Sequence, residues 1–184
     1  MRPTAPPDYL AGYPSALVEP VRRRLADGTL GSVLRQRYPR MHAVRTDKAL
    51  YDYVQEYRNE FLRNSPPLSK VAFDGKIRVV GQVLGTHTRI ARVQGAKLKS
   101  KNEIRIAAVF REMPEELLRM IVVHELAHLR IRDHDKEFYR LCQYMEPAYH
   151  QLEFDARVWL LWLDAQQNGR SDGGAPAATG QGSD

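Results

Sequence analysis

The sequence predicts an α+β fold in which a small β-sheet packs on a buried helix, with additional N- and C-terminal helices around it. Two observations predict this class. Segments 76–84, 88–93 and 103–109 are rich in Val and Ile and are separated by turns that contain glycine, a pattern typical of short strands. Before and after them, apolar residues recur at the spacing of a helix that is buried on one face.

Five helices are expected, and several have clear start or stop signals. Gly28 can take the left-handed position after the first helix, Thr46 or Asp47 can cap the second, and Pro114 is tolerated in the first turn of the third. The helices are expected to cover about 14–27, 47–64, 114–130, 136–145 and 148–166.

The length of 184 residues suits one domain with a sizeable core. The proline-rich start predicts a loose leader, and the Gly/Ala/Ser-rich end is too polar to pack, so we expect it to be disordered. The chain is therefore divided into a leader at 1–13, an N-terminal helical segment at 14–69, the main domain at 70–167 and a disordered tail at 168–184.

Composition favours a cytoplasmic protein. No run of about 18 apolar residues is present, so no membrane span is predicted. The start of the chain lacks the apolar region of a secretory signal, and the single cysteine, Cys142, fits a reducing compartment.

The net charge of +6 is concentrated in the first third of the chain, which makes this third a candidate surface for nucleic acid. No nucleic-acid motif accompanies the charge, so solvated helix faces are the ordinary interpretation. The residues concerned are Arg22, Arg23, Arg24, Arg35, Arg37, Arg40 and Arg45.

The motif HELAH, at residues 124–128, indicates a metal site on the central helix. His124 and His128 are four residues apart and so lie about 40° apart around a helix axis, which lets both imidazoles reach one ion. Glu125 lies close enough to hold a water molecule without binding the metal itself. Zinc would lower the pKa of that water, and the carboxylate would take its proton as general base.

The remainder of this helix places the motif on an inward face. Apolar residues surround most of the axis, whereas Glu116, Arg119 and Arg130 form a narrow charged arc nearly opposite His124 and Glu125. A buried carboxylate needs a cation or hydrogen-bond donors beside it, and a metal ion meets that need.

The third ligand is less sharply specified by the sequence. His134 follows His128 after five residues and is the preferred hypothesis, provided that the helix ends near 130–133. The rivals are carboxylates on the following helices, namely Glu146 and, less favoured, Glu137 or Glu153. Candidates for stabilising negative charge in the reaction are Tyr139, Tyr144, Tyr149 and His150.

The stretch IVVHELAHLRIRDHDKEFYRLC resembles the YgjP-like zinc metallopeptidases, which carry a hydrophobic lead into HELaHL, a third histidine after five residues and a following aromatic pair. The likeness covers roughly residues 70–165. It implies a minimal zincin-like domain with Zn²⁺ held by His124, His128 and His134, and with Glu125 as general base. It also implies that the strand at 104–106 is an edge strand along which an extended peptide could lie.

Three classes of function follow. The preferred one is a zinc metallopeptidase acting on a peptide or an unfolded protein, with a protease recruited to DNA, as in the related SprT-like proteins, as a variant. The second is a metal-dependent nucleotide pyrophosphohydrolase or phosphoester hydrolase, an activity that has been attached to YgjP-like proteins. The third is a non-enzymatic zinc-containing module that binds nucleic acid or protein. Where many family members carry R-W-G-S-C, this chain has RVQGA at 92–96, which leaves substrate preference open.

Overall fold

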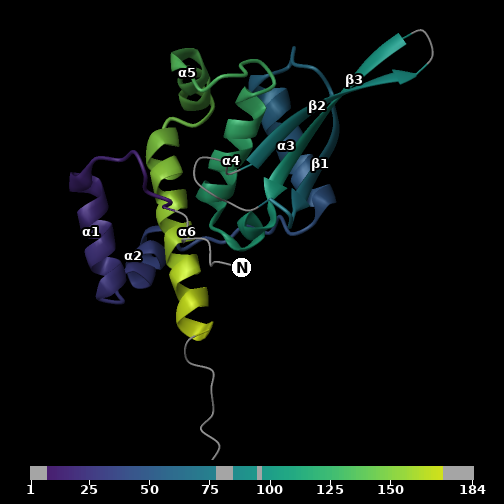
Figure 1. Cartoon of the computed structure of the whole chain (residues 1–184). Coiled ribbons are helices and arrows are strands. Elements are labelled where there is room, and N and C mark those ends of the chain that lie inside the picture. The colour runs from purple at the N-terminus through teal and green to yellow at the C-terminus, as the bar shows by residue number, and fades with distance from the viewer. Residues whose placement is uncertain (1–7, 78–84, 95–96, 172–184) are drawn as a thin grey trace, which may run out of the picture.

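The computed structural model describes residues 8–77, 85–94 and 97–171, and their arrangement is the predicted α+β fold (Figure 1). In chain order the elements are α1 (Ser15–Ala26), α2 (Leu30–Arg37), α3 (Asp47–Phe61), β1 (Leu68–Asp74), β2 (Gly85–Gln94), β3 (Lys97–Ala107), the 3₁₀ turn η1 (Ala108–Glu112), α4 (Glu115–Ala127), α5 (Lys136–Met145) and α6 (Tyr149–Ser171).

The predicted helix boundaries agree closely with the structure. Gly28 follows α1 with a φ of 69°, the left-handed conformation expected of it. The Thr46 hydroxyl accepts a hydrogen bond from the Ala49 N–H and so caps α3. One helix, α2, was not predicted, because its eight residues contain few apolar positions.

The sheet has the strand order β1-β3-β2, with β1 parallel and β2 antiparallel to β3. Arg105, in the middle of the 104–106 segment, pairs with Ala72 of β1 on one side and with Thr86 of β2 on the other. The expectation that this segment is an edge strand is therefore wrong. Its backbone groups already pair on both sides, so an added peptide strand has no place along it.

One strand of the sheet was not predicted. The structure places β1 at Leu68–Asp74, before the predicted segment 76–84, and residues 78–84 lie outside the described residues. Leu68 to Phe73 bring buried apolar side chains to the sheet, because Pro66 and Pro67 end the preceding segment and leave this run free to extend.

Helix α4 is the centre of the core and lies between the sheet and α6 (Figure 1). Every residue from Leu117 to Ala127 except Arg119 is buried. The charged arc predicted to face solvent is only partly exposed. Glu116 pairs with Arg40 at 3.5 Å, and Arg119 pairs with Glu146 at 2.5 Å, so this face packs against neighbouring segments through ion pairs.

The described part of the predicted leader is packed rather than loose. Tyr9 and Leu10 are 7% and 3% exposed and belong to the hydrophobic core, because they give the segment enough apolar surface to bury. Residues 1–7 lie outside the described residues. At the other end, α6 continues through residues 168–171, so the predicted tail begins too early, and residues 172–184 again lie outside the description.

No helix in the described part of the chain combines the length and the apolar character that crossing a membrane requires.

Candidate metal centre

The end of helix α4 turns the chain so that a third histidine faces the first two. The helix ends at Ala127, with His128 as its C-cap, and the backbone turns through Arg130. This end lies slightly before the predicted range of 130–133 and has the same consequence: His134 comes to lie beside His124 and His128. Asp135 then begins α5 by accepting hydrogen bonds from the N–H groups of Glu137 and Phe138.

The three imidazoles converge through their Nε2 atoms. The Nε2 of His128 lies 3.3 Å from that of His124 and 3.1 Å from that of His134, and the remaining separation is 3.2 Å. Ligand nitrogens at 2.0–2.1 Å from a tetrahedral zinc ion would lie about 3.3 Å from one another. The triangle therefore has the dimensions of three ligands around one ion, and it is the one such group among the described residues.

Two hydrogen bonds orient the rings from behind. The Nδ1 of His124 lies 2.7 Å from the Tyr149 hydroxyl, and the Nδ1 of His128 lies 3.0 Å from the Ile131 carbonyl. With Nε2 directed at an ion, each Nδ1–H donates to its partner, which fixes the tautomer. Tyr149 was a candidate for stabilising negative charge, but its hydroxyl is engaged with His124 instead.

Phe138 packs against all three imidazoles. Its ring centre lies 5.0 Å from that of His124, 4.6 Å from that of His128 and 4.7 Å from that of His134. The side chain is fully buried in α5, so it holds the rings in position. The sequence contained this residue in the aromatic pair at 138–139, but without a role for it.

The electrostatics of the site suit a cation. Burial, with the charges of His128, His134 and Arg157, lowers the pKa of His124 to about 3, so its imidazole is neutral, as a ligand must be. Glu125 is 1% exposed, and neither carboxylate oxygen has a hydrogen-bond partner among the described residues. Burial raises its pKa to about 8. A positive ion beside it would stabilise the carboxylate, so the residues present fit a metal ion.

The rival carboxylates are not brought to this triangle. Glu146 accepts hydrogen bonds from the Arg119 guanidinium at 2.5 Å and from the Ala148 N–H at 3.1 Å. Glu153 lies 3.8 Å from Arg157, and Glu137 is exposed at the start of α5. Each carboxylate is therefore engaged elsewhere or directed to solvent.

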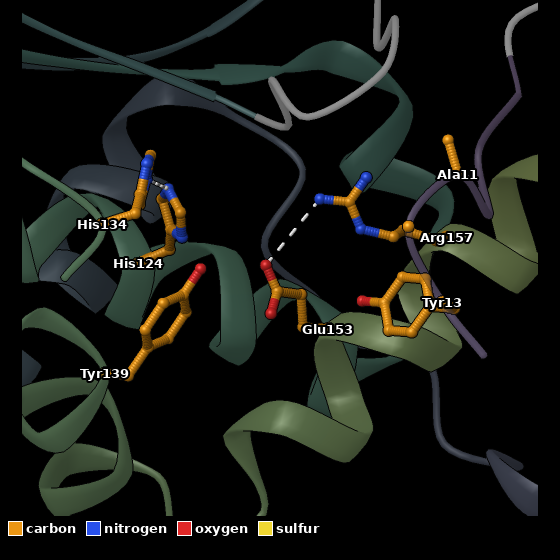
Figure 2. Close-up of a pocket in the computed structure, with 8 residues that line it drawn as sticks. Ala11, Tyr13, His124, His134, Tyr139, Glu153 and Arg157 are labelled. Atoms are coloured by element: carbon orange, nitrogen blue, oxygen red, sulfur yellow. Dashed lines mark hydrogen bonds and ion pairs between the residues drawn. The ribbon is translucent and has the colours of Figure 1, made fainter. Parts of the chain in front are cut away.

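A cavity of about 220 Å³ opens beside the histidines (Figure 2). In this view, His124, His134 and Tyr139 stand on one side and Arg157 and Tyr13 on the other, with Glu153 between them. Residues distant in the sequence meet here, namely Ala11, Gly12, Tyr13, His124, His134, Tyr139, Glu153 and Arg157. Tyr139 was named from the sequence as a candidate, whereas no sequence signal pointed to Tyr13 or Arg157.

Comparison with known proteins agrees with this geometry. Residues 70–155 match the family model described as YgjP-like, metallopeptidase domain. The chain is also 57% identical over 160 residues to the UTP pyrophosphatase of Escherichia coli (strain K12), an alignment that covers 87% of this chain and 96% of the relative. The chain belongs to the YgjP-like family. Membership and the name of the relative make it a hydrolase, which removes the non-enzymatic alternative, and the histidine cluster has the arrangement of a metal site.

No solved structure matches the chain. The zincin-like description of this YgjP-like chain therefore stays a prediction from its motif.

Proposed function

We propose that the protein is a zinc-dependent nucleoside triphosphate pyrophosphatase, with UTP as the first substrate to test. The reaction would join the oxygen of water to the α-phosphorus, break the bond between that phosphorus and the α–β bridging oxygen, and release UMP and pyrophosphate. The observation that carries the substrate is the 57% identity, over nearly the whole length, to a protein named UTP pyrophosphatase.

The hydrolytic chemistry is supported by the histidine triangle and the buried Glu125. His124, His128 and His134 would hold the ion, and three imidazoles are a donor set that suits zinc in catalytic sites. Zinc bound there would supply a Lewis acid and lower the pKa of water. Glu125 would take the proton from the attacking water as general base. Tyr149 and Ile131 would keep the rings of His124 and His128 in the tautomer that the ion needs.

A metallopeptidase is the second candidate. The HExxH motif and the description of the family model support it, and the sequence alone favours it. The peptide-binding mode that the resemblance implied needed a free edge at 104–106, and that segment is paired on both sides. The cavity beside the metal ligands contains the buried cation Arg157, which suits an anionic substrate better than a neutral peptide.

One assay separates the two activities. The zinc-loaded protein is incubated with UTP, the other nucleoside triphosphates and a peptide library in parallel, and the products are identified by mass. We expect UMP and pyrophosphate from UTP, with the peptides intact. Cleaved peptides with intact nucleotides would reverse the order of the candidates, and UDP with orthophosphate would place the cleavage at a different bond.

Replacing Glu125 tests the general base. Glu125→Gln should keep about one zinc per chain and lose turnover by about 10²–10⁴-fold, the usual contribution of a positioned base. Metal content and initial rate are measured on the same preparation. Glu116→Gln is the matched control, since Glu116 lies on the same helix and pairs with Arg40 away from the histidines. Full activity in Glu125→Gln would remove the base role.

Binding of nucleic acid by the basic first third stays a prediction of the sequence. Part of this charge is used within the fold: Arg37 pairs with Asp155, Arg40 with Glu116 and Arg45 with Glu112.

A further inference from the structure

The cavity beside the histidines contains a buried arginine, Arg157, that takes no part in the proposed metal binding or proton transfer. Arg157 lies on α6 and lines the cavity wall, although only 7% of the residue is exposed. Its guanidinium lies 3.8 Å from the Glu153 carboxylate, one turn earlier on the same helix, and Tyr13 lines the same cavity within reach of the charge of Arg157. Burying an arginine side chain costs free energy, and this cost points to a function for Arg157 at the cavity.

We propose that Arg157, with Tyr13 beside it, forms the subsite for the pyrophosphate portion of a nucleoside triphosphate. This inference rests on the proposed function and deepens it. The β- and γ-phosphates carry most of the negative charge of the substrate, and a guanidinium can bind them with two parallel hydrogen bonds. Because His124 and Arg157 line the same cavity, a chain of phosphates can contact both.

The composition of the wall favours phosphates over the uridine portion. Polar groups of Glu153 and Tyr139 line the cavity, and Figure 2 shows the Glu153 carboxylate between His124 and Arg157, with the Tyr139 hydroxyl directed toward it from the side of the histidines. Sites for a neutral base and sugar are mostly apolar and aromatic. In the free protein Glu153 is the counter-ion of Arg157, and bound pyrophosphate would take its place.

The N-terminal segment gives this subsite a fixed second wall. Tyr9 and Leu10 anchor the segment in the core, and Gly12 turns it with a φ of 86°. The ring of Tyr13 then packs edge-on against Phe154 of α6, with 4.9 Å between ring centres. Residues 11–13 are thereby held opposite the metal ligands, although more than a hundred residues separate them in the sequence.

Titration of the zinc-loaded full chain with inorganic pyrophosphate tests the subsite. Calorimetry should report binding that Arg157→Gln weakens by about 10- to 100-fold, the loss expected for a charge-assisted hydrogen bond. Glu153→Gln should bind pyrophosphate more tightly than the wild type, because the competing carboxylate is removed. A purely structural role for the ion pair would instead make both variants equal to or weaker than the wild type.

Two further variants keep the result interpretable. Arg119→Gln also removes a partly buried arginine from an ion pair, but outside the cavity, and should keep wild-type pyrophosphate affinity. Tyr13→Phe removes one hydroxyl and should weaken binding several-fold without unfolding the chain, so it tests the subsite if Arg157→Gln does not fold.

Zinc content and melting temperature are measured for every variant. Unchanged pyrophosphate affinity in a folded, zinc-loaded Arg157→Gln protein would overturn the inference, as would absence of binding to the wild type. UTP hydrolysis is assayed separately. If the wild type cleaves no UTP but binds pyrophosphate through Arg157, the proposed function is contradicted and the subsite is supported. If the wild type cleaves UTP but Arg157→Gln binds pyrophosphate as tightly as the wild type, the subsite alone is contradicted.

Discussion

The protonation state and orientation of the residues at this site are set by their neighbours. His124 is neutral because it is buried, and its ring direction follows from the Tyr149 hydroxyl at 2.7 Å. Neither carboxylate oxygen of Glu125 has a hydrogen-bond partner among the described residues, so burial disfavours its charged form and a cation beside it would stabilise that form. Both effects come from neighbours that lie outside the HExxH motif.

The identity of the third ligand can be tested by metal analysis. His134→Ala should lose most of its zinc, since two histidines leave the ion with half of a tetrahedral shell. Glu146→Ala should keep about one zinc per chain, because that carboxylate pairs with Arg119. Elemental analysis after dialysis gives both values. Full zinc in the His134 variant together with loss in the Glu146 variant would make Glu146 the ligand.

Cys142 should be chemically inert in the folded protein. Burial raises the pKa of its thiol from the usual 9.0 to about 12, so thiolate is scarce at pH 7–9. Because the folded pKa lies above the unfolded one, the protonated thiol favours the fold, and this contribution is lost as the pH rises from 9 towards 12. Labelling with a maleimide at pH 8 should require denaturant, and rapid labelling of the native protein would contradict the burial.

At the scale of elements, the short connection between α4 and α5 decides whether a site exists. Had α4 continued, His134 would lie on the far side of the helix. The structure ends α4 at Ala127 and restarts the chain at Lys136, where Asp135 supplies the cap. The sequence permits this break but does not require it, because the packing of Phe138 against the imidazoles contributes to it.

The cap of α5 can be tested on the metal-free protein, where metal binding does not mask stability. Asp135→Ala should lower the free energy of unfolding by about 1 kcal/mol through loss of two accepted hydrogen bonds. Asp135→Asn should retain most of the stability, and Asp133→Ala, an exposed neighbour that caps no helix, should be close to neutral. Urea denaturation measures all three, and equal losses in the two alanine variants would contradict the capping role.

At the scale of the whole molecule, the N-terminal helices set the position of α6 and hence of Arg157. The Tyr38 hydroxyl donates to Asp155 of α6 at 2.5 Å, and Arg37 pairs with the same carboxylate. Gly31 of α2 lies against Trp162, so closely that an added Cβ would stand 2.6 Å from the indole Nε1. The first third of the chain is thus part of the architecture around the cavity.

The Gly31 contact predicts a destabilising substitution where alanine would ordinarily stabilise a helix. Gly31→Ala should lower the free energy of unfolding by about 1–3 kcal/mol, because the methyl group overpacks the α2–α6 contact. Gly75→Ala is the control, since nothing lies within 4 Å of its added Cβ. Thermal unfolding of both proteins gives the comparison, and a stabilised Gly31→Ala protein would mean that the two helices lie further apart.

The sequence by itself determined the α+β class, most helix boundaries and the HExxH face, because these depend on local spacing and capping. Only the tertiary structure decided that β3 is central, that Tyr9 and Leu10 are core residues and that Arg157 meets the cavity of His124. Strand order and long-range contacts depend on which surfaces bury one another. A local sequence pattern shows which face of a segment is apolar, but not which distant segment packs against that face. The peptide hypothesis relied on such a pairing. The three histidines lie within eleven consecutive residues, so their grouping could be predicted from local spacing.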